Sequence, residues 1–271
     1  MGGSDPIITF ANCPDMHARP AWLRPILVAF ALAPAVLATG QRTYHDGFFS
    51  WSSLQVNMTV ADRWRILPDA SVRRLDGVGA PVTSTARLGV ERAWKTNWTA
   101  AAGYAFFRSY PYAPFANSSV VDEHRAWEQV QHLTGPGRWR WRNRLRVEHR
   151  LIDHLVKKDG MVVVDGSDLV HRYRLKSQLE RRLGSGSRPN WKVFGFCEPM
   201  LRTSGDVELS LVDQLRVGLG GGRRTGPHLE VFGNWMFQWL VRGNGDRIER
   251  NHWIMFTAVL DIDLSRKAAE P

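Results

Sequence analysis

The sequence predicts an all-β protein, an antiparallel transmembrane β-barrel of about 12 strands preceded by a signal peptide. Polar and apolar residues alternate in many strand-length segments, the connections between segments alternate in length, and one segment has charges at almost every second position. A membrane barrel accommodates this pattern, because one face of each strand meets lipid while the other faces a polar interior. The length of 271 residues suits a single barrel.

The N-terminal region carries the pattern of a secretory signal peptide. The apolar run Ile26–Ala38 is too short to cross a membrane as a helix, and it follows two arginines. Val36-Leu37-Ala38 offers a cleavage site, with Ala38-Thr39-Gly40 as a second choice. We therefore predict a signal peptide with an upstream extension over residues 1–38 and an outer-membrane barrel over residues 39–271. A buried hydrophobic helix is the alternative.

The cysteines argue against an intramolecular disulfide and against a Cys/His metal site. Cys13 precedes the apolar run and would be removed with it, so the remaining Cys197 could form no intramolecular disulfide. No Cys/His spacing typical of a metal site occurs, and we expect neither a metal nor another cofactor.

Eleven segments show a period of two. In the first, Leu54 and Val56 share one face while Ser53 and Gln55 share the other, as expected for a strand between lipid and water. The segments are Trp51–Val60, Trp64–Arg73, Thr83–Trp94, Trp98–Arg108, Glu123–Gln131, Arg138–Leu151, Leu169–Leu183, Trp191–Met200, Glu208–Gly220, His228–Trp239 and Arg250–Leu264.

The connections give a direction to each strand. Membrane barrels place short turns on the periplasmic side and longer loops outside. The Trp51 strand ends in a short turn, so a further strand over Arg42–Phe49 would have to precede it. The connection lengths therefore predict an even count of twelve strands, with both termini periplasmic.

Tryptophans cluster beside the connections. Five abut short turns, as expected for an aromatic girdle at a membrane interface: Trp64, Trp94, Trp98, Trp139 and Trp191. Trp239 and Trp253 flank a longer connection and could belong to the opposite girdle. The alternative is that these rings pack a soluble core.

Two neighbouring predicted strands, Arg138–Leu151 and Leu169–Leu183, carry most of the net charge of +10. Turning their charged face to lipid would cost roughly 2–4 kcal/mol per midplane arginine, so we predict that it points into the barrel. A hairpin turning at Asp159-Gly160 would pair Glu148 with Arg172 and, on the outer face, Leu145 with Leu175. A turn at Asp165-Gly166 is the rival.

Several motifs resemble those of a known family, filed as domain of unknown function 2490. The matching stretches are Glu123–Gln129, Arg142–Arg150, Arg172–Leu175, Glu198-Pro199 and Asp213–Gly220. The resemblance implies a barrel in the outer membrane of a Gram-negative bacterium and brings no established activity. One departure is the C-terminus, where Ser265–Pro271 replaces the terminal aromatic residue common in such barrels.

The charged face defines the candidate site. An excess of positive charge favours a narrow anion-selective channel or a barrel that binds anionic solutes, whereas interlocked charges alone would make a structural, plugged barrel. The candidate anion-binding residues are Arg125, Arg140, Arg142, Arg144, Arg146, Arg150, Arg172, Arg174, Lys176 and Arg216, with Glu123, Glu148, Glu180 and Glu198 as their acidic partners.

Two other functions are weaker. A lipid-modifying enzyme would need its Ser, His and Asn together on the outer wall, but the predicted register puts His149 six residues from Asn143, about 20 Å away. We therefore expect no enzyme. Nucleic-acid binding by alternating Arg and Trp conflicts with the signal peptide and the apolar outer face. The expected partners are outer-membrane lipid, lipopolysaccharide, the barrel-assembly machinery and a small anionic solute.

Overall fold

The computed structural model describes residues 42–112, 119–184, 190–203, 212–242 and 245–265, and the predicted signal peptide lies outside them. The described residues form twelve β-strands: β1 (Thr43–Ala61), β2 (Trp64–Ile66), β3 (Asp69–Leu75), β4 (Pro81–Lys95), β5 (Trp98–Ser109), β6 (Val121–Thr134), β7 (Trp139–Lys158), β8 (Met161–Leu183), β9 (Trp191–Arg202), β10 (Val212–Arg224), β11 (Leu229–Arg242) and β12 (Arg247–Asp263). Within this part of the chain, no helix is long and apolar enough to cross a membrane.

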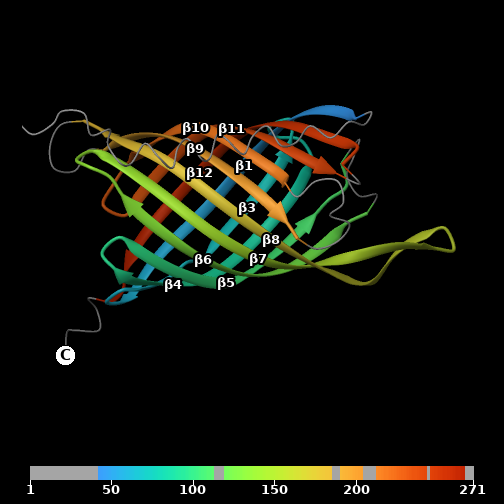
Figure 1. Cartoon of the computed structure of the whole chain (residues 1–271), viewed down its shortest axis with the longest axis horizontal. Helices are drawn as coiled ribbons and strands as arrows, with labels where there is room; N and C mark the ends of the chain where they lie inside the picture. Colours follow the sequence, from blue (N-terminus) through green and yellow to red (C-terminus); the bar gives the residue numbers. More distant parts are fainter. Residues whose placement is uncertain (1–41, 113–118, 185–189, 204–211, 243–244, 266–271) are drawn as a thin grey trace, which may run out of the picture. The chain divides into compact units, whose positions relative to one another are not determined.

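These strands form a closed barrel (Figure 1). Each strand from β4 to β12 pairs antiparallel with the next one in the chain, and β1 closes the ring by pairing with β12. The short β2 and β3 both lie between β1 and β4, separated by Leu67 and Pro68. Because β2 and β3 follow one another in the same place between β1 and β4, they count as one strand of the ring. Eleven strands therefore close the barrel. The predicted all-β, mostly antiparallel barrel is confirmed.

The predicted even strand count is wrong. Residues 43–61 form one continuous strand, so Arg42–Phe49 does not make a separate strand ahead of Trp51. The eleven segments recognised in the sequence correspond to the eleven strands of the ring. With an odd number, the closing pair must be parallel, and β1 does run parallel to β12, with Thr43 beside Arg247 and Thr59 beside Asp263. The start of β1 and the end of β12 thus lie at opposite ends of the barrel, which corrects the prediction that both termini share one end.

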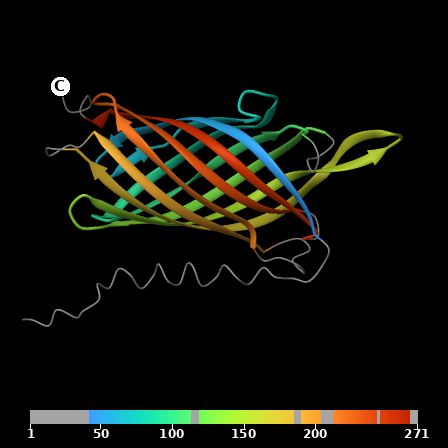
Figure 2. The same cartoon turned by 90° about the horizontal axis from the view of Figure 1, so that it is seen from above.

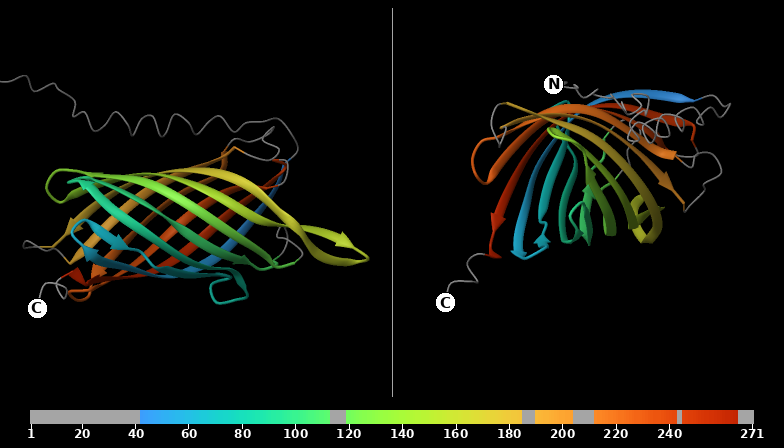
Figure 3. Two further views of the ribbon diagram at one scale, coloured as in Figure 1. Left: turned by 90° about the horizontal axis from the view of Figure 1, so that it is seen from below. Right: turned by 60° about the vertical axis from the view of Figure 1, so that its left-hand side comes forward.

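The two faces of the wall differ as the alternation predicts. Leu54, Leu88, Leu145, Leu175 and Leu219 are among the large apolar side chains that remain exposed on the outside. The residues between them point inward and include many buried charged groups, such as Glu148 and Arg146. Such an exposed apolar belt around a polar interior is typical of a barrel that spans a membrane. Figure 3 shows the inclined strands that form this wall.

The β1–β2, β4–β5, β6–β7 and β10–β11 turns lie at one end of the barrel, which we call the turn end; the other end, where β1 begins, is the loop end and includes the β7–β8 turn. All five tryptophans predicted beside short turns are between 37% and 53% exposed, as a girdle requires. Trp94 stacks on Trp98. Trp253 is different, because it points inward and is only 5% exposed, so its predicted place in an outer girdle is wrong.

The β7–β8 hairpin follows the predicted register. It turns at Asp159-Gly160, and both residues have positive φ, as a type I′ turn requires. Leu145 pairs with Leu175, and Glu148 pairs with Arg172. β6 stops pairing with β7 at Ile152 and β9 begins pairing with β8 at Arg172, so the intervening hairpin projects beyond the loop end (Figures 1 and 2).

Aromatic side chains fill part of the interior. Trp127 is buried and packs with Ala101, Ala105 and Phe107. The wall beside it is formed by Gly89, where an added Cβ would lie 2.6 Å from the Trp127 ring. Glycine at this position therefore allows the indole to lie close to the backbone. Side chains, rather than open solvent, occupy this section of the barrel.

Candidate anion site in the barrel lumen

A cavity of about 440 Å³ lies inside the barrel. Eleven cationic side chains line it: Arg73, Arg87, Arg125, Arg144, Arg146, Arg150, Arg172, Arg174, Lys176, Arg216 and Arg242. Asp69, Glu123 and Glu198 are the lining carboxylates, and three more, Glu148, Asp213 and Glu249, pair with the lining arginines. In this set the cations outnumber the anions by five.

Glu148 is the centre of a buried ion-pair network. Its side chain is only 1% exposed, and it accepts hydrogen bonds from Arg125 Nη1 at 2.9 Å and from Arg174 Nη1 at 2.7 Å. Burial of a carboxylate is tolerated only when charged or polar partners replace its water, as the two guanidinium groups do here. The network joins β6, β7 and β8 and stiffens this wall.

Two further glutamates extend the network. Glu123 Oε1 accepts from Arg125 Nη2 at 2.6 Å and from Arg150 Nε at 2.7 Å. Glu198 Oε1, on β9, accepts from Arg144 Nη2 at 2.6 Å and from Arg174 Nη2 at 2.9 Å. Four arginines donate to these three carboxylates, so the network itself contains more positive than negative charge.

Three cations are held by neutral groups instead. The guanidinium of Arg73 lies 4.0 Å from the ring centre of Trp51 and 5.9 Å from that of Trp253, and Lys176 Nζ lies 4.3 Å from the ring centre of Phe196. Arg146 donates from Nε and Nη2 to the amide oxygen of Gln129 and also faces the Trp127 ring. Among the described residues, none of these three cations has a carboxylate within ion-pair distance.

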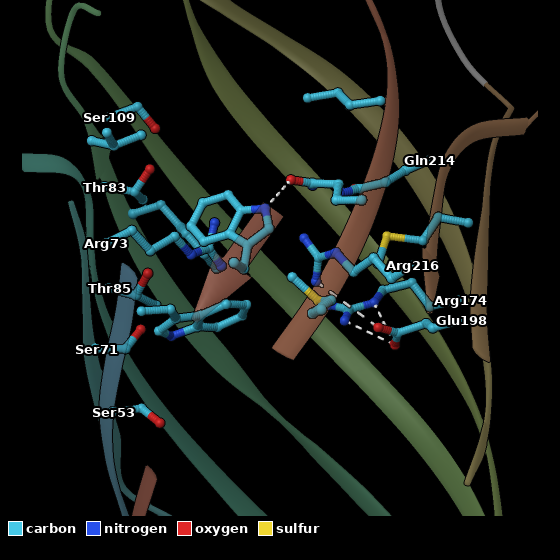
Figure 4. A pocket seen from close by; sticks show the side chains of 18 of the residues that line it. Ser53, Ser71, Arg73, Thr83, Thr85, Ser109, Arg174, Glu198, Gln214 and Arg216 are labelled. Atoms are coloured by element: carbon cyan, nitrogen blue, oxygen red, sulfur yellow. Dashed lines mark hydrogen bonds and ion pairs between the residues drawn. The ribbon is translucent and has the colours of Figure 1, made fainter. Parts of the chain in front are cut away.

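Aromatic rings position a cation without neutralising its charge. Figure 4 shows Arg73 on one side of the cavity, and Arg216, Arg174 and Glu198 on the other. Arg216 is also weakly neutralised, because its nearest carboxylate contact, with Glu198, is 3.9 Å long. Positive charge is therefore available to a mobile anion on both sides of the cavity.

Most of the chain matches one sequence family. The family model described as "Protein of unknown function (DUF2490)" matches residues 48–249, most of the chain. The chain belongs to the DUF2490 family. The matched range runs from β1 to the start of β12 and includes the whole Glu123–Glu148–Glu198 network. No curated protein matches the chain.

Most of the predicted site residues of this DUF2490 barrel meet in the cavity. Eight of the ten predicted cations line it: Arg125, Arg144, Arg146, Arg150, Arg172, Arg174, Lys176 and Arg216. Arg140 instead donates to the backbone carbonyl of Gly137 in the β6–β7 turn, and neither it nor Arg142 is among the lining residues. Glu180 is buried beside Arg182 and Lys192, away from the Glu148 network.

The opposite wall of the DUF2490 barrel contributes charged residues that were not among the predicted site residues. Arg73, Asp69 and Arg87 line the cavity from β3 and β4, and Arg87 pairs with Asp69 at 3.0 Å. The period of two in Trp64–Arg73 and Thr83–Trp94 puts them on the polar face of their strands, opposite residues such as Ala70 and Leu88. They were missed because single charges among Ser and Thr give a weaker signal than a run of arginines.

The polar residues considered for an enzyme lie on the outer wall. Asn143 pairs in register with Ser177, and His149 pairs with His171 six residues along each strand. Ser177 Oγ accepts a hydrogen bond from Trp141 Nε1 at 2.7 Å, and the two histidines contact each other at 2.9 Å. This register keeps the serine apart from the histidines in the DUF2490 barrel.

Proposed function

We propose that this protein is an outer-membrane β-barrel that binds small anionic solutes inside its lumen. The exposed apolar belt and the exposed tryptophans at the turn end support a membrane location. The outer membrane is the one that holds β-barrels in Gram-negative bacteria, and a lumen with excess positive charge would concentrate anions by focusing the electric field.

One observation carries the proposal: Arg73, Lys176 and Arg146 are anchored by aromatic or amide groups. A purely structural network would match each buried cation with a carboxylate, because unpaired buried charge is costly. Cations held by neutral groups are stabilised further when an anion enters. A purely structural role explains the Glu148 network, but it does not explain why Arg73, Lys176 and Arg146 are held by neutral groups.

Calorimetric titration of the detergent-solubilised protein with acetate and with inorganic phosphate tests the proposal. We expect saturable binding that weakens as chloride is added, and that weakens about 10-fold or more in a variant combining Arg73→Gln with Lys176→Gln. Arg63→Gln is the control, because Arg63 lies in the exposed β1–β2 turn. Absence of saturable binding, or equal binding by the double variant, would contradict an anion-binding lumen.

Conduction is a second candidate, favoured by the excess of five cations around the cavity. Trp127 and its neighbours occupy the interior beside the cavity, which favours binding over rapid passage. Single-channel recording across a KCl gradient distinguishes the two. A current with an anion-selective reversal potential supports a channel, and a silent or cation-selective protein excludes it.

We infer no catalytic role for the outer-wall polar residues. The Trp141 indole donates a hydrogen bond to the Ser177 hydroxyl oxygen. His149 and His171 lie too far from Ser177 along the strands to accept the proton of its hydroxyl group. Hydrolysis of phospholipid by the purified protein in the presence of calcium would overturn this inference.

Labelling of intact cells tests the location. Asp246, in the β11–β12 turn, lies at the loop end beside Thr43, and exposed Thr96 lies in a turn at the other end. If short turns are periplasmic, a membrane-impermeant maleimide should label Asp246→Cys and spare Thr96→Cys, both in a Cys197→Ser background. Labelling of neither site, or the reverse pattern, would contradict the proposed location or orientation.

A further inference from the structure

The cavity has one wall built from hydroxyl groups. Six hydroxyl side chains from β1, β3, β4, β5 and β12 line it, and we call them the hydroxyl patch: Ser53, Ser71, Thr83, Thr85, Ser109 and Thr257. Strand register brings them together. Ser53 pairs with Ser71 and Thr257, and Ser71 pairs with Thr85, which makes one row across four strands.

Arg73 lies in the adjacent row of the same wall. It pairs with Trp51 on one side and with Thr83 on the other, and Thr83 pairs with Ser109. In Figure 4 the labelled hydroxyl side chains lie on the same side as Arg73, with Arg174, Glu198, Gln214 and Arg216 across the cavity. The lumen is therefore asymmetric: one wall is rich in hydroxyl groups and carries Arg73 and the Arg87–Asp69 ion pair, and the wall facing it is strongly charged.

Several polar atoms lining the cavity have no hydrogen-bond partner among the described residues. Trp51 Nε1 and Arg73 Nε are donors, Asp69 Oδ2 and Asn251 Oδ1 are acceptors, and Thr85 Oγ1 can serve as either. Thr85 is only 9% exposed and Asn251 only 1%. Buried polar groups are usually satisfied, so this mixture of donors and acceptors describes what a ligand must offer.

The two unpartnered acceptors, Asp69 Oδ2 and Asn251 Oδ1, indicate which class of anion fits the cavity. A simple oxyanion such as a carboxylate presents only acceptors, which suit Arg73 and Trp51 but not Asp69 Oδ2 or Asn251 Oδ1. A ligand that satisfies both kinds of group must also carry O–H or N–H donors. The hydroxyl patch strengthens this requirement, because Ser and Thr exchange hydrogen bonds readily with other hydroxyl groups.

The size of the site also favours more than a bare oxyanion. The patch extends from β12 to β5, four strand spacings of roughly 4.8 Å each. A volume of about 440 Å³ falls in the range of small organic ligand sites, roughly 300–1,000 Å³. The ligand therefore extends well beyond its acid group.

We propose that the cavity recognises a polyhydroxylated organic anion, with its acid group between Arg73 and Arg216 beside Trp51 and its hydroxyl groups against the hydroxyl patch. Trp51 links the two arginines, since their guanidinium groups lie 4.0 Å and 5.7 Å from its ring centre. This inference rests on the proposed anion-binding function and adds the chemical class of the ligand.

Three matched probes test the class of ligand in calorimetric titrations of the whole solubilised protein. Gluconate has an acid group and hydroxyls, hexanoate has the same chain length and acid group without hydroxyls, and sorbitol has hydroxyls without charge. We expect gluconate to bind about 10-fold or more tightly than hexanoate, and sorbitol to show no saturable binding. Equal affinities for gluconate and hexanoate would overturn the inference while leaving the anion-binding function intact, whereas failure of every anion to bind would overturn both.

A single hydroxyl deletion sharpens the test. Thr85→Val keeps the shape of the side chain and removes its hydroxyl, so gluconate affinity should fall roughly 5–10-fold while hexanoate affinity is unchanged. Ser84→Ala, one residue along β4 and on the opposite face, is the matched control and should change neither. Ser71→Ala provides a second deletion if Thr85→Val does not fold. An equal loss for both ligands, or no loss from either deletion, would refute recognition through the hydroxyl patch.

Discussion

Arg242 Nη2 on β11 donates a hydrogen bond of 2.7 Å to the hydroxyl oxygen of Tyr112, which follows β5 in the chain. Four strands of the ring separate β5 from β11 on one side and five on the other, so this contact crosses the barrel. The Tyr112 hydroxyl also donates to Glu249 Oε2 at 3.3 Å, and its ring packs edge-on against Phe49 at 5.7 Å. The segment after β5 is thereby tied to the far wall.

Tyr112→Phe should lower the free energy of unfolding by about 1.5–3 kcal/mol, because a hydrogen bond to a charged group is lost while the ring remains. Urea titration in detergent or lipid measures this change. Tyr110→Phe is the matched control, since no described residue hydrogen-bonds the Tyr110 hydroxyl. Equal stability of the two variants would show that the Tyr112–Arg242 contact does not hold the fold.

Glu148→Gln should destabilise the barrel by about 3–5 kcal/mol, because it leaves the buried guanidinium groups of Arg125 and Arg174 short of one negative charge. The same titration measures the effect. Asp62→Asn should change stability by less than about 1 kcal/mol, since Asp62 is 95% exposed and its pair with Arg63 is weak. A loss no larger than that of Asp62→Asn would mean that the network is not needed for stability.

Leu145→Arg tests which face of the wall meets lipid. Leu145 lies on the outer face opposite Leu175 and Val130 and is 45% exposed. An arginine there should cost about 2–4 kcal/mol when the barrel folds into lipid vesicles. Leu145→Met, which keeps the position apolar, should be close to neutral. A neutral arginine would argue that this face does not contact hydrocarbon.

His154 provides a pH-dependent contact in the projecting hairpin. Its Nδ1 lies 3.0 Å from Asp168 Oδ2, and the hydrogen bond and charge of Asp168 raise the pKa of His154 above its usual 6.5. Because the folded pKa is the higher one, the contribution of the pair is complete below pH 6.5 and is lost as the pH rises through the folded pKa.

NMR titration of the His154 ring should show that Asp168→Asn returns its pKa towards the usual value. Asp165→Asn should lower the pKa of His154 less, because Asp165 acts only through its charge at longer range. If the two substitutions shifted the pKa equally, the hydrogen bond to Asp168 would not be the main cause.

Local patterns were sufficient for the wall of the barrel. The alternation from Arg138 to Leu151 identified which side chains face inward, and the Asp159-Gly160 turn set the register that pairs Leu145 with Leu175. Both features depend only on residues near each other in the chain, because a strand alternates by geometry and a tight turn fixes the pairing of the strands it joins.

The way in which the ring closes could not be predicted from such local patterns. No local signal in Ser50–Ser53 reveals whether β1 continues or turns, and its continuity is set by pairing with β12, about 200 residues away in the chain. The odd strand number and the parallel seam follow from that pairing.

The same distinction applies to the site. By itself, the sequence determined that this protein is a barrel with the charged face of its Arg138–Leu151 strand inside. Only the tertiary structure decided that Arg73 is held by Trp51 and Trp253 rather than by a carboxylate, and that a hydroxyl wall faces the charged one. The physical reason is that inward orientation follows from the two-residue period of one strand, whereas the partners across the lumen depend on how the whole sheet curves and closes.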